Sequence, residues 1–139
     1  MIEFNFLTDF TLNDQEEIAL KINNFITSEG FIVGEINYIF CDDVYLHQLN
    51  KKFLKHTTYT DIISFDYCSG KQISGDIFIS IERVLENANF FLTSFKNELY
   101  RVMIHGILHY MGYTDFTTED KKKMRNKEDT TLLHLKLDL

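Results

Sequence analysis

Residues 2–6 alternate between apolar and polar side chains, and this two-residue period predicts a β-strand with one buried face. From Ile18 to Gly30, apolar residues instead recur every three or four positions. That spacing predicts an amphipathic helix that ends at the glycine. Asn13 followed by Glu16 resembles a capping box, so Asn13 is expected to cap this helix.

The middle of the chain continues with both kinds of pattern. Residues 35–40 predict a second strand, after which Asp42 or Asp43 can cap a helix. The β-rich segments 61–67 and 76–80 flank turn-forming residues, which predicts an antiparallel hairpin. The helix that Asp42 or Asp43 can cap has its apolar positions at Val44, Leu46, Leu49, Phe53 and Leu54.

Three further helices are predicted after the hairpin. Ser94 can cap one that runs to about Met111 with Gly112 as its stop, and a polar helix is expected from Thr118 to about Leu135. Together the segments predict an α/β (α+β) fold with one small sheet of about four strands covered by about five helices. Ser80 can cap the first of the three helices. The apolar positions of that helix are Val84, Leu85, Ala88 and Leu92.

Length and composition predict one globular domain. The chain has 139 residues, 45% of them hydrophobic and 25% charged, with no proline and no linker-like stretch, so residues 1–139 are expected to form a single domain. No apolar run reaches the roughly 18–20 residues needed to cross a bilayer. Glu3 and Asp9 lie where a secretory signal is basic, so we expect a cytoplasmic protein without a membrane partner.

Charge and cysteine usage exclude several classes of protein. A net charge of −7 argues against strong non-specific electrostatic binding of bare nucleic acid. RNA binding would therefore need a local basic strip, a metal ion or a partner. Cys41 and Cys68 lack the spacing of metal or redox motifs, which argues against a disulfide framework and a Cys-based zinc site. Both are expected to be free, buried thiols.

His105 and His109 carry the strongest chemical signal. Four residues advance a helix by about one turn, so both imidazoles leave the same helix face and can reach one cation. Gly112 is expected to end the helix, and Tyr113 and Thr114 to turn the chain so that Asp115 can approach the same point. A His-x3-His-x5-Asp set supplies three ligands and leaves a fourth position for water, which is typical of a catalytic zinc site. The alternative is that both histidines lie at a surface or in a satisfied core.

Gly106 narrows the kind of chemistry expected. It costs about 1 kcal/mol of helix propensity relative to alanine, which indicates that the backbone or the space there is needed. It also occupies the position of the glutamate that acts as general base in His-Glu-x-x-His zinc peptidases. Hydrolysis by that peptidase route is therefore disfavoured.

Residues 105–115, His-Gly-Ile-Leu-His-Tyr-Met-Gly-Tyr-Thr-Asp, resemble the His-Gly-x-Leu-His-Leu-x-Gly-Tyr-Asp-His signature of the YbeY family of endoribonucleases and ribosomal RNA maturation factors. Leu49-Asn50, residues 60–65 and residues 75–80 are similar to three further family motifs, in order and spacing. Met124 and Glu128 fall where the C-terminal helix of the family has methionine and glutamate. The resemblance covers nearly the whole chain.

The resemblance implies a single domain with a small mixed sheet, a zincin-like metal helix and one Zn²⁺ ion held by His105, His109 and Asp115. It also implies metal-dependent cleavage of single-stranded RNA in ribosomal RNA maturation, including processing of the 16S rRNA 3′ end, and in ribosome quality control. The acidic charge of the chain leaves room for targeting by the ribosome, through a ribosomal protein or a GTPase.

Two positions depart from the family pattern. Asp115 replaces a third histidine, and a carboxylate lowers the charge of the site, so that other divalent ions also fit. Leu54 stands where the family has an arginine thought to meet the phosphate. Lys52, Lys55 or His56 can supply the missing positive group, or each can be an exposed loop residue. His56 is also a candidate catalytic proton donor or acceptor.

Further polar residues are candidates with two interpretations. In the family, Asn50, Asp61 and Ser64 would contact substrate, whereas residues of these types also cap helices and strands. Asp76 is expected to mark a strand start or to orient a histidine. The basic residues within 121–127 are expected to form a solvated helix face or a phosphate-contact strip.

The sequence thus predicts a metal-dependent endoribonuclease. In this hypothesis the ion polarises a phosphodiester oxygen and activates either water or the ribose 2′-hydroxyl, and the pattern leaves the nucleophile open. Two alternatives are a different metallohydrolase, acting on peptide, amide or small phosphoester bonds, and a catalytically weak ribosome-assembly or RNA-binding factor.

Overall fold

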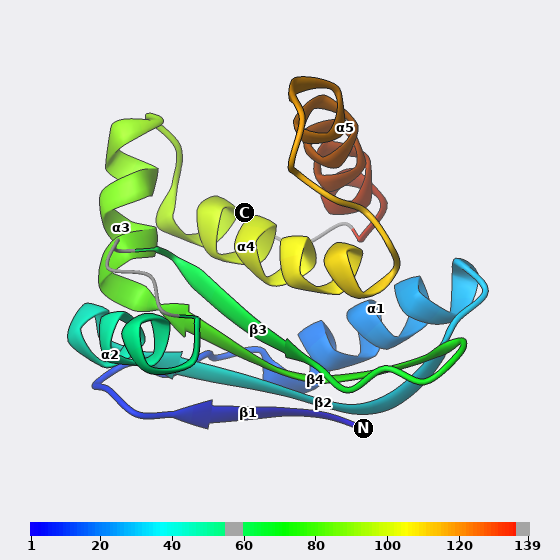
Figure 1. The fold of residues 1–139 in the computed structure, drawn as a ribbon, viewed down its shortest axis with the longest axis horizontal. Coiled ribbons are helices and arrows are strands. Elements are labelled where there is room, and N and C mark those ends of the chain that lie inside the picture. The colour runs from blue at the N-terminus through cyan, green and yellow to red at the C-terminus, as the bar shows by residue number, and fades with distance from the viewer. Residues whose placement is uncertain (55–59, 136–139) are drawn as a thin grey trace.

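Four strands form one mixed sheet in the computed structural model, which describes residues 1–54 and 60–135 (Figure 1). The strands are β1 (Ile2–Phe6), β2 (Ile32–Cys41), β3 (Ile62–Asp66) and β4 (Gln72–Ser80). Their order in the sheet is β1-β2-β4-β3. β1 and β4 both run parallel to β2, while β3 pairs antiparallel with β4 and forms an edge. The small mixed sheet and the antiparallel hairpin are therefore as predicted.

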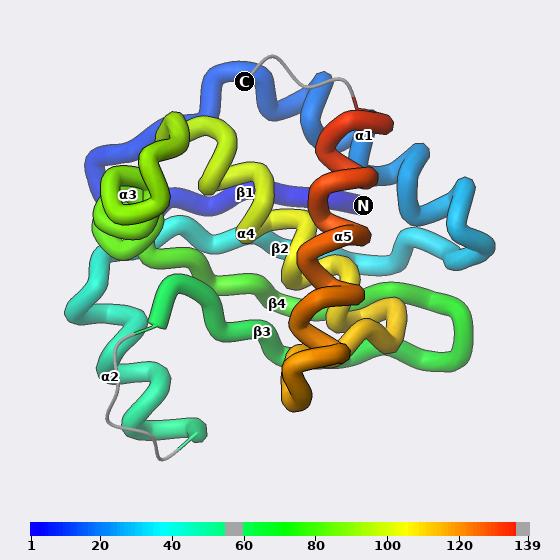
Figure 2. Tube along the Cα trace, turned by 90° about the horizontal axis from the view of Figure 1, so that it is seen from above, coloured from blue at the N-terminus to red at the C-terminus, as the bar shows by residue number. Residues whose placement is uncertain are grey.

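Five helices accompany the sheet in the described part of the chain. They are α1 (Gln15–Ser28), α2 (Asp43–Phe53), α3 (Ile81–Phe90), α4 (Phe95–Tyr110) and α5 (Thr118–Leu135). Figure 1 shows α4 lying along one face of the sheet, and Figure 2 shows α5 crossing over α4. None of these helices combines the length and apolar character needed to span a lipid bilayer.

The main core lies between the sheet and helices α1 and α4. Tyr38 and Phe40 of β2 are fully buried there, beside Ile77 of β4. Burial of each such side chain contributes about 1.5–3 kcal/mol. The hydroxyl of Tyr38 donates a 2.9 Å hydrogen bond to the backbone carbonyl of Met103 in α4, so the polar atom that it brings into the core has a partner.

A smaller apolar cluster lies on the opposite face of the sheet, against α2. It contains Cys41, Leu46 and Ile63, all buried. Burial and nearby carboxylates raise the pKa of the Cys41 thiol to about 12, so this thiol is not expected to ionise at neutral pH. Both cysteines are free as predicted, but Cys68 is only partly buried.

Side-chain caps determine where several helices begin. Asp42, Ser80 and Ser94 each accept a hydrogen bond from the backbone N–H three residues later, at 2.8, 3.1 and 3.0 Å. These three predicted caps are confirmed. The capping box at Asn13 is wrong: the residue before α1 is Asp14, and its side chain makes no capping hydrogen bond.

Two strands begin earlier than predicted. β2 starts at Ile32 and β4 at Gln72, whereas the predictions began at residues 35 and 76. The pairing register of β2 and β4 shifts between Val33 and Ile36. Because such an irregularity interrupts the two-residue alternation, the pattern revealed only the regular part of each strand.

Several apolar residues assigned to helix faces do not enter the core. α3 ends at Phe90, and Leu92 follows it with a φ of 55° and 93% exposure, so its assignment to that helix is wrong. Leu54 likewise follows the end of α2. The predicted apolar positions that are exposed are Val44, Phe53, Leu54, Leu85 and Leu92.

Candidate metal centre

Helix α4 presents two imidazoles that lie one turn apart on the same face. The Nε2 atoms of His105 and His109 are 2.9 Å apart. After α4, Gly112 adopts a φ of 104°, a left-handed conformation that suits glycine, and the chain turns back. This turn places Oδ2 of Asp115 3.5 Å from Nε2 of His105 and 3.6 Å from Nε2 of His109.

The spacing of these three donor atoms fits a tetrahedral metal ion. Ligands about 2.1 Å from zinc at tetrahedral angles lie about 3.4 Å from one another. The measured separations of 2.9, 3.5 and 3.6 Å lie close to that value. Imidazole nitrogen and carboxylate oxygen are also donors that zinc accepts. His105, His109 and Asp115 could therefore hold a metal ion and leave a fourth coordination position open.

Gly106 allows this stretch of α4 to approach the sheet. A Cβ atom at Gly106 would lie 3.1 Å from Cδ1 of Ile77 and 3.2 Å from Cδ1 of Ile62. Both distances are tighter than ordinary van der Waals contact. The space at Gly106 is therefore limited, although the atoms that limit it are the flexible ends of two side chains.

Glu128 of α5 orients His105. Its Oε2 atom lies 2.7 Å from Nδ1 of His105, and the carboxyl group is buried, with a 6% exposed side chain. A carboxylate accepts, so Nδ1 carries the proton and donates it. This tautomer leaves the lone pair of Nε2 free for a metal ion, and it makes that nitrogen a better donor.

Arg101 holds Glu128 in place from the other side. Its Nη1 atom donates to Oε1 of Glu128 at 3.0 Å, and its Nη2 atom donates to Oδ1 of Asp129 at 2.7 Å. A buried carboxylate needs such a partner, because an uncompensated buried charge costs several kcal/mol. The chain of contacts from Asp129 through Arg101 and Glu128 to His105 therefore fixes α5 against α4 and supports the metal centre.

The two histidines have pKa values shifted in opposite directions. Burial lowers the pKa of His105, but the hydrogen bond and the charge of Glu128 outweigh it, and the net shift is upward. The pKa of His109 is lowered by burial and by the neighbouring His105. The His109 ring also makes a hydrogen bond with the backbone of Tyr113, which helps to fix its orientation.

A cleft of about 410 Å³ opens beside the centre, between α3, α4, α5 and the start of β3. Asp61 lies in this cleft with His105 and Asp115, so the structure brings one predicted substrate-contact residue to the metal ligands. Burial raises the pKa of the Asp61 carboxyl group. The polar residues that line the cleft are Asp61, Asn87, Glu98, Arg101, His105, Asp115, Lys121, Arg125 and Glu128.

The other predicted site residues lie elsewhere or cannot be placed. Ser64 of β3 makes a hydrogen bond with Tyr110 and is not among the described residues that line the cleft. Asn50 is buried within α2 and does not line it either. Lys55 and His56 lie outside the described residues.

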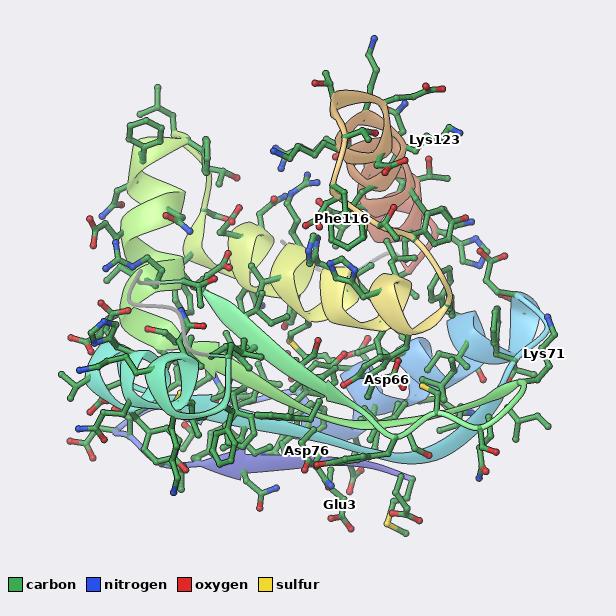
Figure 3. All side chains as sticks on the ribbon, in the orientation of Figure 1. Glu3, Asp66, Lys71, Asp76, Phe116 and Lys123 are labelled. Atoms are coloured by element: carbon green, nitrogen blue, oxygen red, sulfur yellow. The ribbon has the colours of Figure 1, made fainter. Side chains whose placement is uncertain are left out.

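Neither role expected for Asp76 is correct: it lies inside β4, which begins at Gln72, and it does not orient a histidine. Figure 3 shows Asp76 on the side of the sheet away from α4. Its Oδ1 atom accepts a 3.0 Å hydrogen bond from Nδ2 of Asn37 in the neighbouring strand. Because strand residues alternate between faces, a carboxylate at this position points away from the metal ligands.

The sequence analysis did not identify Arg101 or Glu128 as residues that support the metal centre, although the pattern of α5 contains an indication for Glu128. In α5 the buried residues Met124, Leu132 and Leu135 recur at helical spacing, and Glu128 falls within that apolar stripe. A glutamate on the buried face of a helix is rare unless it is paired. Its place in the stripe indicates a buried partner, but it does not reveal which residue.

Replacing Glu128 with glutamine is expected to lower metal affinity by about 10–100-fold, because an amide holds His105 less firmly in the binding tautomer. Affinity is measured by competition with a chromophoric chelator. Asp129→Asn is the matched control, since Asp129 also pairs with Arg101 but contacts neither histidine. Equal metal affinities for Glu128→Gln and the wild type would contradict the assigned role.

Comparison with known proteins gives one consistent result. A model of the family "endoribonuclease YbeY" matches residues 6–136 of the chain. Endoribonuclease YbeY of Flavobacterium johnsoniae is 54% identical over 129 residues, which cover 93% of each chain. That of Karelsulcia muelleri is 41% identical over 136 residues, covering 98% of this chain and 96% of the relative. The solution structure of TM1509 from Thermotoga maritima is similar with a TM-score of 0.69 and 26% identity, covering 97% of this chain and 89% of that one.

Proposed function

The chain belongs to the YbeY endoribonuclease family, and from this premise we propose that residues 1–139 form a metal-dependent endoribonuclease domain that cleaves single-stranded RNA. We assign its action to the maturation of ribosomal RNA in the cytoplasm, including the 3′ end of 16S rRNA. The observation that carries this proposal is the convergence of His105, His109 and Asp115 on one point, beside a cleft that His105 and Asp115 line.

Zinc is the ion that the donor set favours. Two imidazole nitrogens and one carboxylate oxygen, with a fourth position open, match a catalytic zinc site. Because the third ligand is the anionic Asp115, harder divalent ions such as manganese also fit. Bound there, the ion would supply Lewis acidity to the scissile phosphodiester and lower the pKa of a coordinated water molecule.

The residues of this chain have separate tasks around that ion. Glu128 keeps His105 in the tautomer that exposes Nε2, and the Arg101 ion pair keeps Glu128 in place. Asp61 lies in the cleft and is assigned a contact with RNA, since a carboxylate can accept a hydrogen bond from a ribose hydroxyl or a base amino group. Asn50, Lys55 and Ser64 remain predicted contacts, and His56 remains a predicted proton carrier.

The acidic net charge of the protein favours a cellular partner that delivers the RNA. The net charge of −7 gives bare RNA no broad attraction to the surface as a whole. We therefore assign the delivery of ribosomal RNA to the ribosome itself, through a ribosomal protein or a GTPase. Under this arrangement we expect the isolated protein to cleave short single-stranded RNA without that partner.

The proposed function is tested by offering the metal-loaded protein two substrates, a short single-stranded RNA and casein. We expect RNA cleavage without proteolysis. Proteolysis without RNA cleavage would overturn the proposal in favour of a different metallohydrolase. Mass analysis of the RNA ends then separates attack by the 2′-hydroxyl, which leaves a cyclic phosphate, from attack by water, which does not.

A further inference from the structure

The basic residues of α5 do not all serve the same purpose. Lys127 forms an ion pair with Glu29, the residue that follows α1, and Lys123 lies 3.8 Å from Glu119 on its own helix. Lys121 and Arg125, by contrast, line the cleft together with His105 and Asp115. The solvated face and the phosphate-contact strip that the sequence left as alternatives are therefore two parts of one helix.

Helical spacing explains why these two residues share the cleft. Lys121 and Arg125 are four positions apart, and Glu128, which contacts His105, follows three positions later. Residues at this spacing lie above one another on a single helix face. Lys121 and Arg125 therefore continue, toward the helix start, the same face that supports the metal centre.

Both groups are available to a ligand. The side chain of Arg125 is 55% exposed, and its nearest ionic partner is Glu128, at 3.9 Å. Lys121 is exposed and forms no ion pair with any residue of the described ranges. Arg101 also lines the cleft, but Glu128 and Asp129 already occupy its guanidinium group.

Cationic side chains are needed in this cleft if an RNA strand is to bind there. Four carboxyl groups line it, and they would repel the phosphates of an RNA strand. On the opposite wall lie Asn87 of α3 and Phe91, the residue after it, and neither carries a charge. Among the described residues that line the cleft, the cations that remain available thus lie on α5.

We propose that Lys121 and Arg125 are the phosphate-binding residues of this cleft. Leu54, which follows α2 and stands where the family has an arginine, is not among the described residues that line the cleft. The inference rests on the proposed function, because the ligand is single-stranded RNA. Arg125 suits this task well, since its guanidinium group can donate two hydrogen bonds to one phosphate.

The test compares Lys121→Gln/Arg125→Gln with Lys122→Gln/Lys123→Gln, which removes the same charge from the same helix away from the cleft. Binding of a fluorescent single-stranded RNA of about 12 nucleotides is measured by anisotropy in chelator, without metal, over a range of salt concentrations. The same proteins are then loaded with metal, and kcat/KM for RNA cleavage is measured over the same salt range.

We expect the cleft variant to bind RNA roughly tenfold or more weakly than wild type, since hydrogen bonds to charged groups are lost. The slope of log affinity against log salt should fall by about 1.4, which is about 0.7 for each contact removed. The control pair should change neither quantity appreciably. If metal-free binding is too weak to measure, we expect kcat/KM of the cleft variant to show the same roughly tenfold loss and the same smaller dependence on salt.

Equal losses in the two double variants, or no loss in either, would overturn the inference. These outcomes are distinct from failure of the proposed function. If the wild-type protein cleaves RNA and the cleft variant cleaves it equally well, only the assignment of Lys121 and Arg125 fails. If the metal-loaded wild type cleaves no RNA at all, the proposed function fails and the inference falls with it.

Discussion

RNA cleavage by His109→Ala is expected to fall by about 1,000-fold or more. The substitution removes one of three donor atoms that lie within 3.6 Å of one another, and two remaining ligands hold a divalent ion poorly. A metal ion in such a site is worth several kcal/mol of transition-state stabilisation, and about 4 kcal/mol corresponds to this factor. Initial rates on single-stranded RNA at saturating metal measure the effect.

His134→Ala is the matched control, because His134 is an exposed histidine near the end of α5. It should cleave RNA at the wild-type rate, and circular dichroism should show both variants folded. His109→Ala also tests the alternative that the protein is a catalytically weak ribosome-assembly factor. A chain that only binds RNA would still support ribosome maturation in cells with alanine at position 109, whereas the enzyme would not.

Gly75→Ala is expected to reduce the free energy of unfolding by roughly 3 kcal/mol. A methyl group at Gly75 would overlap the hydroxyl of Tyr110 and the backbone carbonyl of Phe65. These two atoms are themselves joined by a 2.8 Å hydrogen bond that ties the end of α4 to the sheet. Because one of them belongs to the backbone of β3, no rotation of a side chain relieves both contacts. Denaturation in urea measures the loss.

Gly106→Ala provides the comparison for Gly75→Ala. At Gly106 the added methyl group meets only the flexible ends of Ile77 and Ile62, at 3.1 and 3.2 Å. The helix propensity of alanine offsets this crowding by about 1 kcal/mol. We expect a net change within about 1 kcal/mol of wild type. A Gly75→Ala protein as stable as Gly106→Ala would contradict the packing described for α4.

Local pattern was sufficient to predict the elements and the three candidate ligands. A helix repeats every 3.6 residues, so the His105–His109 spacing fixes their common face before any tertiary contact is known. Gly112 and Asp115 follow so closely that the turn leaves little freedom. Element ends were harder to predict where the pattern is interrupted, as at the irregular pairing of β2 with β4 and at the exposed Leu92.

Contacts between distant segments could not be predicted in the same way. His105 and Glu128 are 23 positions apart, and they meet because α5 crosses over α4 (Figure 2). Asp76 was the wrong choice for that partner, since its strand turns it to the opposite face of the sheet. Which helix covers which face depends on the packing of the whole core, and that information is not local.

Metal analysis of purified protein tests the central claim most directly. The wild type and the double variant His105→Ala/His109→Ala are prepared side by side, and their metal content is measured by elemental mass spectrometry. We expect about one divalent ion per chain in the wild type and almost none in a folded double variant. Equal metal content in the two proteins would show that these imidazoles do not hold the ion.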